Sequence, residues 1–375
     1  MLTAKQRIYA ALEGRPVDRM PVTSLYNQLY IQDHYAELTG EAEWQMHEWL
    51  NASPDQHTAT YRKIVAAAPF EILQPQLAES HRVRESRRFI VRDGVMCRED
   101  TISGEVLPVS TVSGHARDYR ANETQFVYTA RDIDEQFHLR TAQQQIADGQ
   151  YDYVQAVVAE MGRDRFILTG GVVGTLYLCH NYLGLTNLFE MLAAQPDLVD
   201  YISQKILEQN IEDIRAHASA GGDAIYIDDA TATNDMISVA HYERFSFPYM
   251  KQMVDEIHRL GHKAIVIYFG GVADRLEQIA ALGADGLSVE TSMKGYVNDM
   301  VQIAEAIGDR VSLFGNIDPV GVLQDGTDAE LDAEIARQAE AGRKARGFIM
   351  CTGSPITPHT PLARVQHFIT QSISA

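Results

Sequence analysis

Polar side chains stand directly after short apolar runs of the sequence, where they could hold or move a proton. Asp228 and Asp229 end one such run, and Glu290 ends another. Tyr268 ends a third run, and His180 follows a further apolar stretch. Carboxyl, phenol and imidazole groups can act as acids, bases or hydrogen-bond donors. We therefore expect four catalytic residues: Asp228, Glu290, Tyr268 and His180.

A second set of residues could line a pocket for a substrate. They lie at the ends of apolar runs and carry phenol, amide, carboxyl or thiol groups: Tyr26, Asn27, Asp229, Asn316 and Cys351. Glycines at the same places would leave room for a large flat ligand: Gly170, Gly171, Gly270, Gly271, Gly315 and Gly353. The sequence therefore predicts a substrate pocket surrounded by these positions.

Several of these residues also have a purely structural interpretation. The pair Asp228–Asp229 could cap the loop that follows it. Glu290 could form an ion pair with Lys294, and Asn316 could pin a turn. A histidine on a helix, such as His180, is often packed and satisfied locally. Both interpretations stay open from the sequence alone.

Motifs for metal or nucleotide binding are incomplete. The glycine-rich segment Thr169–Gly174 does not match GxGxxG, and no GK[ST] follows it. The three cysteines, Cys97, Cys179 and Cys351, have no CxxC spacing. The sequence leaves a metal site open, because four side chains could in principle supply ligands: Asp228, Glu290, Cys351 and His180.

Eight strand-like runs alternate with segments of helical periodicity. Most runs are continuously apolar, which is typical of strands covered on both faces. They are Met20–Leu25, Phe70–Gln74, Phe166–Thr169, Ala224–Asp228, Lys263–Tyr268, Asp285–Glu290, Val311–Phe314 and Gly347–Cys351. Amphipathic stretches such as Tyr242–Leu260 and Ala329–Lys344 separate them. This pattern predicts class α/β and one closed (β/α)8 TIM barrel over residues 1–375, with a doubly wound open sheet as the alternative.

The region from about 81 to 130 interrupts this alternation. Arg88–Cys97 and Val106–Val112 have the pattern of antiparallel strands, with a turn at Asp93 and Gly94. We therefore expect a small antiparallel β insert within the barrel domain. In TIM barrels the catalytic groups lie at the C-terminal ends of the strands, which is where the candidate residues fall.

Composition and charge exclude several classes of protein. The 375 residues are 45% hydrophobic and 22% charged, which is typical of a folded chain. With 32 basic and 51 acidic residues the net charge is −19, so nucleic acids and membrane surfaces are not expected as partners. No apolar run approaches the ~18 residues of a membrane span, and no signal-peptide core occurs near residue 1. We expect a cytoplasmic protein, and homo-oligomer formation stays open.

Four segments resemble the uroporphyrinogen decarboxylase superfamily. Met1–Val22 is similar to its opening, and Thr360–Val365 is similar to the start of its C-terminal helix. Gly283–Glu290 and Asp309–Pro319 resemble two of its barrel segments. The resemblance covers nearly the whole chain outside the insert, and it implies a (β/α)8 barrel.

Two departures from the family patterns bear on the activity. The decarboxylases bind a polyanionic tetrapyrrole through an arginine-bearing loop, but Ser24–Tyr30 has no cationic residue, so substrate carboxylates would stay unpaired. Methyltransferases of thiols in this superfamily hold zinc through an H-x-C motif and a later cysteine. The corresponding positions here are about Ile267, Phe269 and Ser354.

The resemblance therefore implies the corrinoid-dependent methyltransferase branch, and Val289–Gly295 resembles a segment of its O-demethylase components. Such an enzyme would move a methyl group from a small methylated donor, a methoxylated aromatic, to the cobalt of a corrinoid (cobalamin) on a partner protein. Zinc stays open as a cofactor. The alternatives are a uroporphyrinogen-decarboxylase-like decarboxylase of another substrate and a non-enzymatic barrel with an obstructed mouth.

Overall fold

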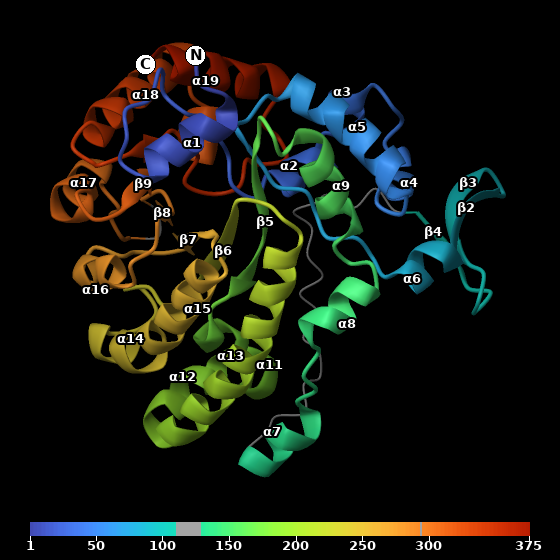
Figure 1. Cartoon of the computed structure of the whole chain (residues 1–375), viewed down its shortest axis with the longest axis horizontal. Coiled ribbons are helices and arrows are strands. Elements are labelled where there is room, and N and C mark those ends of the chain that lie inside the picture. The colour runs from blue at the N-terminus through green and yellow to red at the C-terminus, as the bar shows by residue number, and fades with distance from the viewer. Residues whose placement is uncertain (110–128, 293–294) are drawn as a thin grey trace.

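A curled parallel sheet forms the centre of the computed structural model, which describes residues 1–109, 129–292 and 295–375 (Figure 1). Its seven strands lie in the order β1-β5-β6-β7-β8-β9-β10, and each adjacent pair is parallel. The strands are β1 (Ile72–Leu73), β5 (Phe166–Val173), β6 (Ala224–Asp229), β7 (Lys263–Tyr268), β8 (Gly286–Val289), β9 (Ser312–Phe314) and β10 (Phe348–Ile349). This order follows the chain, whereas an open doubly wound sheet reverses its order at a switch point.

The chain around Val22 closes the sheet into a barrel. Val22 forms a parallel bridge with Met350, directly after β10, and the Thr23 N–H donates to the Met350 carbonyl over 2.9 Å. On the other side, the Glu71 N–H donates to the Val22 carbonyl over 3.1 Å. The strand expected over Met20–Leu25 is reduced to this single bridge at Val22. Pro21, directly before it, has no N–H to donate to a strand ladder. The predicted TIM barrel is confirmed, and the open-sheet alternative is wrong.

Helices surround the barrel on its outer face. The helices of the first part of the chain are α1 (Ala4–Leu12), α2 (Asn27–Asp33), α3 (Tyr35–Thr39), α4 (Gln45–Trp49), α5 (Pro54–Ala67) and α9 (Asp152–Met161). Those after β5 are α10 (Thr175–Leu178), α11 (His180–Leu183), α12 (Leu185–Ala194), α13 (Pro196–Ser219), α14 (Val239–Phe245), α15 (Phe247–Arg259), α16 (Leu276–Ala281), α17 (Met300–Ile307), α18 (Asp328–Gly342) and α19 (Leu362–Ser374), with a π-helical turn η1 (Pro319–Gln324). Among the described helices, none combines the length and the apolar character needed to cross a membrane.

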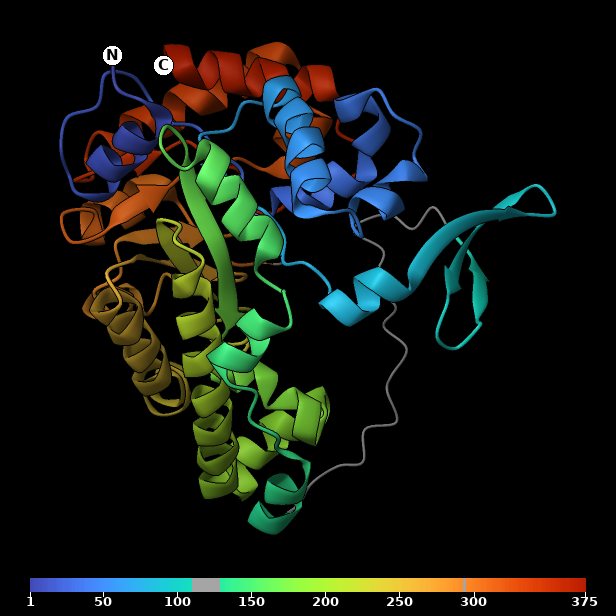
Figure 2. The same cartoon turned by 45° about the vertical axis from the view of Figure 1, so that its right-hand side comes forward.

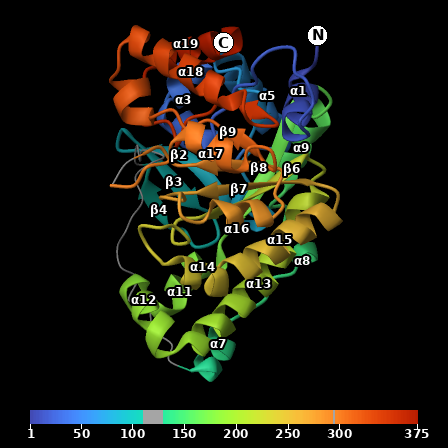
Figure 3. The same ribbon diagram turned by 90° about the vertical axis from the view of Figure 1, so that its left-hand side faces the viewer.

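Of the two long helices expected from the sequence, one is present as a single helix and the other is divided in two. The stretch Ala329–Lys344 is α18, which begins with a capping box formed by Thr327 and Glu330. The stretch Tyr242–Leu260 is two helices, because Ser246 leaves the helical path and a new helix, α15, begins at Phe247 with Pro248 in its first turn. Figure 3 shows α15 lying beside α13 on the outside of the barrel.

Side chains alternate between the inside and the outside of the barrel along each strand. On β6, Ala224 and Tyr226 belong to the inner apolar cluster, whereas Ile225 and Ile227 belong to the outer cluster that packs against the helices. Helix α1 closes the N-terminal end of the barrel, because Leu12 and other apolar residues of α1 join the inner cluster. The mouth at the C-terminal ends of the strands is therefore the end where a ligand could enter.

The antiparallel insert forms an arm that stands away from the barrel (Figure 2). It consists of α6 (His81–Ser86) and the strands β2 (Arg87–Arg92), β3 (Val95–Asp100) and β4 (Val106–Pro108). The turn between β2 and β3 has positive φ at Asp93 and Gly94, 52° and 78°, as a two-residue hairpin turn requires. The predicted insert is therefore present, although its residues 110–128 lie outside the described part of the chain.

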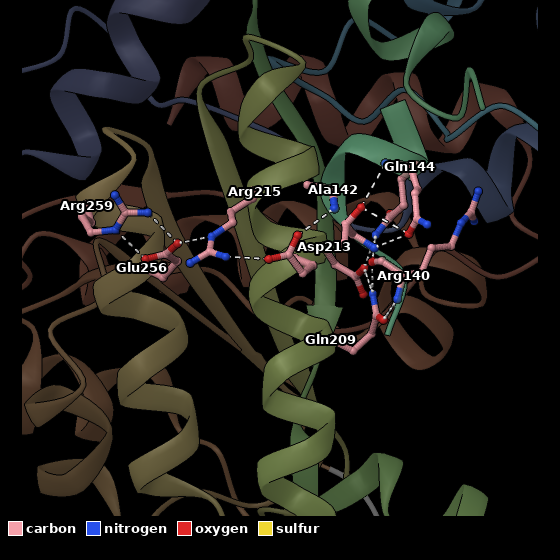
Figure 4. A network of polar contacts seen from close by, with 11 residues as sticks. Arg140, Ala142, Gln144, Gln209, Asp213, Arg215, Glu256 and Arg259 are labelled. Carbon is pink, nitrogen blue, oxygen red and sulfur yellow. Dashed lines mark hydrogen bonds and ion pairs between the residues drawn. The ribbon is translucent and has the colours of Figure 1, made fainter. Parts of the chain in front are cut away.

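The chain returns from the arm through α7 (Ala130–Gln136) and α8 (Ala142–Ala147), and polar contacts attach the start of α8 and the residues before it to α13 (Figure 4). The side chain of Gln209 donates to Asp213 over 2.7 Å and to the Arg140 carbonyl over 3.0 Å. On the other side of α13, Arg215 donates to Glu256 of α15 over 2.9 Å. Helix α13 thus connects the segment after the arm with the barrel.

A buried histidine couples the stability of this fold to pH. The His57 ring lies between the rings of Trp49 and Tyr153, with centroids 4.5 and 3.8 Å away. Its Nδ1 faces the Trp49 carbonyl over 3.3 Å and donates to it, because a carbonyl only accepts. Burial lowers the pKa of His57 from 6.5 to about 4, so the folded protein keeps this ring neutral.

We predict that the free energy of unfolding falls as the pH is lowered from 6.5 to about 4. In this interval the unfolded chain binds a proton at His57 that the folded chain does not bind, which favours unfolding by on the order of 3 kcal/mol. The His57→Phe variant keeps a flat ring and should lose this part of the slope in urea denaturation. The exposed His138 gives a control, His138→Gln, whose slope should stay that of the wild type. An unchanged slope in His57→Phe would contradict the prediction.

Candidate active site

Tyr26 and Asp228 form a hydrogen-bonded pair at the mouth of the barrel. The Tyr26 hydroxyl donates to Oδ2 of Asp228, which continues the inner face of β6 two residues after Tyr226. Tyr26 precedes α2 in a left-handed conformation with φ of 58°, which is strained for a tyrosine by on the order of 1 kcal/mol. Burial, with smaller contributions from Tyr226 and Asp228, raises the pKa of Tyr26 well above its ordinary value. The hydroxyl therefore stays protonated and remains a donor.

Aromatic rings enclose this pair. The centroids of the Tyr226 and Phe269 rings each lie 5.4 Å from that of Tyr26. All three rings belong to the inner cluster of the barrel or pack against it. A hydrogen bond to a carboxylate is stronger in such a poorly solvated place than in water.

Glu290, directly after β8, forms a second pair of tyrosine and carboxylate. The Tyr296 hydroxyl donates to Oε2 of Glu290, and Ser354 Oγ donates to Oε1 over 3.3 Å. The Asn298 amide donates to the Glu290 carbonyl over 2.9 Å and fixes its backbone. Burial, together with the bond to Glu290, raises the pKa of Tyr296. Because β7 separates β6 from β8, the two strands that carry the carboxylates are about 10 Å apart.

A cavity of about 200 Å³ lies between the C-terminal ends of β1 and β5. Its wall includes five residues from separate parts of the chain: Gln28, Gln74, Gly170, Gly171 and Tyr226. Tyr226 also contacts the ring of Tyr26. The cavity therefore adjoins the first tyrosine–carboxylate pair.

The glycines at the strand ends do not leave room for a large flat ligand, so this expectation is wrong. A Cβ added to Gly170 would lie 2.2 Å from the ring of His217, and a Cβ at Gly171 would lie 2.3 Å from the ring of Tyr226. Protein atoms also fill the space at four others: Gly270, Gly271, Gly315 and Gly353. The glycines make room for the protein's own side chains and backbone.

The structure corrects the placement of Tyr268, which does not point into the mouth. It lies on the outer face of β7 and is fully buried. Its hydroxyl lies 2.8 Å from that of Tyr242 and donates to the sulfur of Met250 over 3.3 Å. A substrate in the mouth cannot reach this side chain, because the strand itself lies between them.

Asp229 also lies on the outer side of its strand. Its Oδ1 accepts from the N–H and the hydroxyl of Thr231, over 2.7 and 2.8 Å, and from the Ala232 N–H over 2.9 Å. Burial raises the pKa of this carboxyl. Asp229 therefore caps the loop that follows it, which is one of the two roles that the sequence allows. The adjacent residues Asp228 and Asp229 face different surroundings.

Asn316 and Cys351 lie at strand ends with their polar groups occupied. The Asn316 amide donates to the Asn298 carbonyl over 2.9 Å, and its Oδ1 accepts from Gln338 over 3.1 Å. Cys351 is buried in the inner cluster, where burial raises the pKa of its thiol to about 12. Both residues support the wall of the mouth.

The structure places Asn27 and His180 on the helices that follow their strands. The Asn27 N–H donates to Gln74 Oε1 over 3.2 Å, while its own Oδ1 is buried without a hydrogen bond. His180 begins α11, and its Nδ1 faces the Tyr177 carbonyl one turn earlier. The ion pair considered for Glu290 involves Lys294, which lies outside the described residues.

The residues that the structure describes do not fit a bound zinc ion. In residues 1–109, 129–292 and 295–375, no group of three or more His, Cys, Asp or Glu side chains is arranged to hold a metal. At the positions of the zinc motif, Ile267 lies in the barrel core and Phe269 packs against Tyr26. The third position, Ser354, donates to Glu290.

Sequence reasoning missed four residues that shape this mouth: Gln28, His217, Tyr226 and Tyr296. A signal existed for Tyr226, because residues two apart on a strand share one face and Tyr226 precedes Asp228 by two. The others come from helices or loops, and no local pattern connects them with a strand end.

Comparisons with known proteins agree with this architecture. The family model described as uroporphyrinogen decarboxylase (URO-D) matches residues 118–372. A Methanosarcina mazei protein described as methylcobamide:CoM methyltransferase MtbA is 23% identical over 376 residues, which cover 98% of this chain and 96% of that protein. The uroporphyrinogen decarboxylase of Tolumonas auensis is 30% identical over 183 residues, covering 48% of this chain and 49% of that one.

A solved structure of a methyltransferase from Methanosarcina mazei has the same fold. It superposes with a TM-score of 0.67 at 19% sequence identity and covers 99% of this chain and 98% of that one. The likeness extends over the whole barrel.

A double-mutant cycle can test whether the ring of Tyr226 fills the space at Gly171. Gly171→Ala should destabilise the protein by about 1–3 kcal/mol, because the new methyl group overlaps the ring. In Tyr226→Ala the same substitution should cost at least ~1 kcal/mol less. Gly342→Ala overlaps Phe348 instead and is the matched control, whose cost should be the same with or without the Tyr226 ring. Additive losses for Gly171 and Tyr226 in chemical denaturation would contradict the assignment.

Proposed function

Since the chain belongs to the uroporphyrinogen decarboxylase family, we propose that it is a corrinoid-dependent methyltransferase that demethylates a methoxylated aromatic. The observation that carries this proposal is the Tyr26–Asp228 pair, a protonated donor held beside a poorly solvated pocket. Similarity over almost the full length to proteins described as methylcobamide:CoM methyltransferases supports the coarser statement that it transfers methyl groups with a corrinoid. The decarboxylase relatives match over about half of the chain.

The charge on the leaving group explains why a tyrosine hydroxyl that donates a hydrogen bond suits this reaction. A reduced corrinoid on a partner protein would accept the methyl group at its cobalt. The methyl–oxygen bond breaks, its electron pair stays on the oxygen, and the aryl ether leaves as a phenolate. A donor aimed at that oxygen stabilises the developing charge, and a neutral hydroxyl can do so without a metal ion.

Tyr26 is the residue placed for this task, and Asp228 positions it. In the structure the Tyr26 hydroxyl donates to Asp228, which fixes its direction. The hydroxyl carries a single proton, so it leaves Asp228 and donates to the substrate oxygen as that oxygen gains negative charge. The phenolate takes this proton, and the Tyr26 oxygen regains one from water, which leaves as hydroxide. Glu290, held by Tyr296 and Ser354, would orient the donor from the opposite side of β7. The barrel contributes mainly proximity and alignment.

Methylation of a thiol through zinc has less support. A thiolate is the nucleophile in that reaction, and zinc serves to form it. Isoleucine, phenylalanine and serine at the three motif positions cannot replace histidine and cysteine ligands. The direction of transfer from an ether to the corrinoid needs no thiolate on this chain.

We predict that Tyr26→Phe lowers the rate of methyl transfer by about 10²-fold, because one donor to the developing oxyanion is removed. The measurement is transfer from 2-methoxyphenol to a corrinoid, followed by the absorbance of the cobalt. Tyr9→Phe is the matched control, because Tyr9 donates to Asp223 over 3.0 Å at the closed end of the barrel. Equal rates in both variants would remove Tyr26 from the mechanism.

Two isosteric changes separate the roles of the carboxylates. Asp228→Asn should lower the rate by at least ~10-fold, because the carboxylate keeps the Tyr26 ring at the mouth before its hydroxyl turns to the substrate oxygen, and an amide holds this ring less firmly. Glu290→Gln should raise KM more than it lowers kcat if this residue orients the donor.

Release of carbon dioxide without a corrinoid would support the decarboxylase instead. Absence of turnover and of ligand binding would support the non-enzymatic barrel.

A further inference from the structure

The cavity between β1 and β5 has the size of one substituted ring. Its volume of about 200 Å³ corresponds to the liquid volume of roughly seven water molecules. Sites for drug-sized ligands are larger, about 300 Å³ or more. This volume accommodates a benzene ring with two small substituents.

One wall of the cavity is bare backbone. Strand β5 shifts its register against β6 between Leu168 and Gly171, so Thr169 and Gly170 bulge from the sheet. The His217 ring sits behind this bulge, where its Nδ1 donates to the Thr169 carbonyl over 3.2 Å. The ring of Tyr226 forms another part of the wall. Backbone without side chains next to an aromatic ring is a surface that a flat ring can contact closely.

A hydrogen-bond acceptor in the wall lacks a partner. The Oε1 atom of Gln28 is buried and accepts no hydrogen bond, although its residue lines the cavity. Buried polar atoms are nearly always paired in folded proteins. This atom has almost no accessible surface, so the Gln28 side chain must rotate toward the cavity before a ligand there can donate to it. A hydroxyl group on the ligand would supply that donor.

The charges around the cavity disfavour an anion. Among the described residues that line it, none is lysine or arginine. Burial lowers the pKa of His217 to about 4, so this ring is neutral at pH 7. Asp228 lies two residues beyond Tyr226 on the same face of β6. A carboxylate in the cavity would lose its hydration without gaining a cationic partner.

We propose that this cavity binds the ring of an uncharged methoxyphenol, with Gln28 accepting a hydrogen bond from the phenol and the methoxy group directed toward Tyr26. The methoxy group in this statement rests on the proposed function. The preference for an uncharged ring that donates a hydrogen bond rests on the cavity alone. Tyr226 connects the two, because it lines the cavity and its ring packs against Tyr26.

Calorimetric binding to the full chain, with no corrinoid present, tests the preference separately from catalysis. The probes are 2-methoxyphenol, 1,2-dimethoxybenzene and 2-methoxybenzoate, which differ in one substituent. The phenol should bind about ten-fold more tightly than dimethoxybenzene, because only the phenol donates to Gln28. The benzoate should bind at least ~100-fold more weakly than the phenol.

Two variants and a control make the assignment specific. Gln28→Leu should remove the difference between the phenol and dimethoxybenzene. Gln32→Leu, on the same helix but outside the cavity wall, should keep it. Gln76→Arg places a cation in the wall and should raise the affinity for 2-methoxybenzoate at least ~10-fold. This gain does not depend on the stability of the Gln28 variant.

The outcomes separate this inference from the proposed function. Tight binding of the benzoate by the wild type, or a phenol preference that survives Gln28→Leu, would overturn the inference. The inference would also be overturned if none of the three probes binds while the enzyme transfers methyl groups from another donor. If the phenol binds as expected but no methyl group reaches a corrinoid, the cavity assignment stands and the proposed function fails.

Discussion

The alternation of side chains along the strands of a closed barrel governs which residues can meet at its mouth. Neighbouring residues on one strand face opposite sides, so Asp228 enters the mouth whereas Asp229 caps a loop outside it. The same rule places Phe269 against Tyr26 and turns Tyr268 toward the helices. Closure around Val22 makes the rule strict, because every strand then has one face toward the enclosed core.

The mouth pairs tyrosines with carboxylates, and the described residues that line its cavity include neither lysine nor arginine. Each pair keeps a hydroxyl protonated and gives it a direction, at Asp228 through Tyr26 and at Glu290 through Tyr296. Such groups suit a leaving oxygen that gains charge during the reaction, and they suit a substrate with several carboxylates poorly. Electrostatics and cavity size thus lead to the same class of small neutral ligand.

The glycines at the strand ends have a different physical role from the one their positions indicate. Gly170 and Gly171 admit His217 and Tyr226, which shape the wall of a small cavity. In our proposal, the space that remains holds a single ring. A corrinoid on a partner protein would therefore meet the substrate at the rim of the barrel, while the ring of the donor lies deeper.

Local periodicity and contiguous segments of the chain predict the order of the strands, most of the helices, the TIM barrel, the antiparallel insert and the family. The sequence also located Asp228 and Glu290 at strand ends. Folding in three dimensions is needed to see that Tyr26 holds Asp228, that Tyr296 holds Glu290, and that Gln28 and His217 line one cavity. These contacts join residues from different elements, and the packing of side chains in three dimensions leaves no periodic trace in the chain.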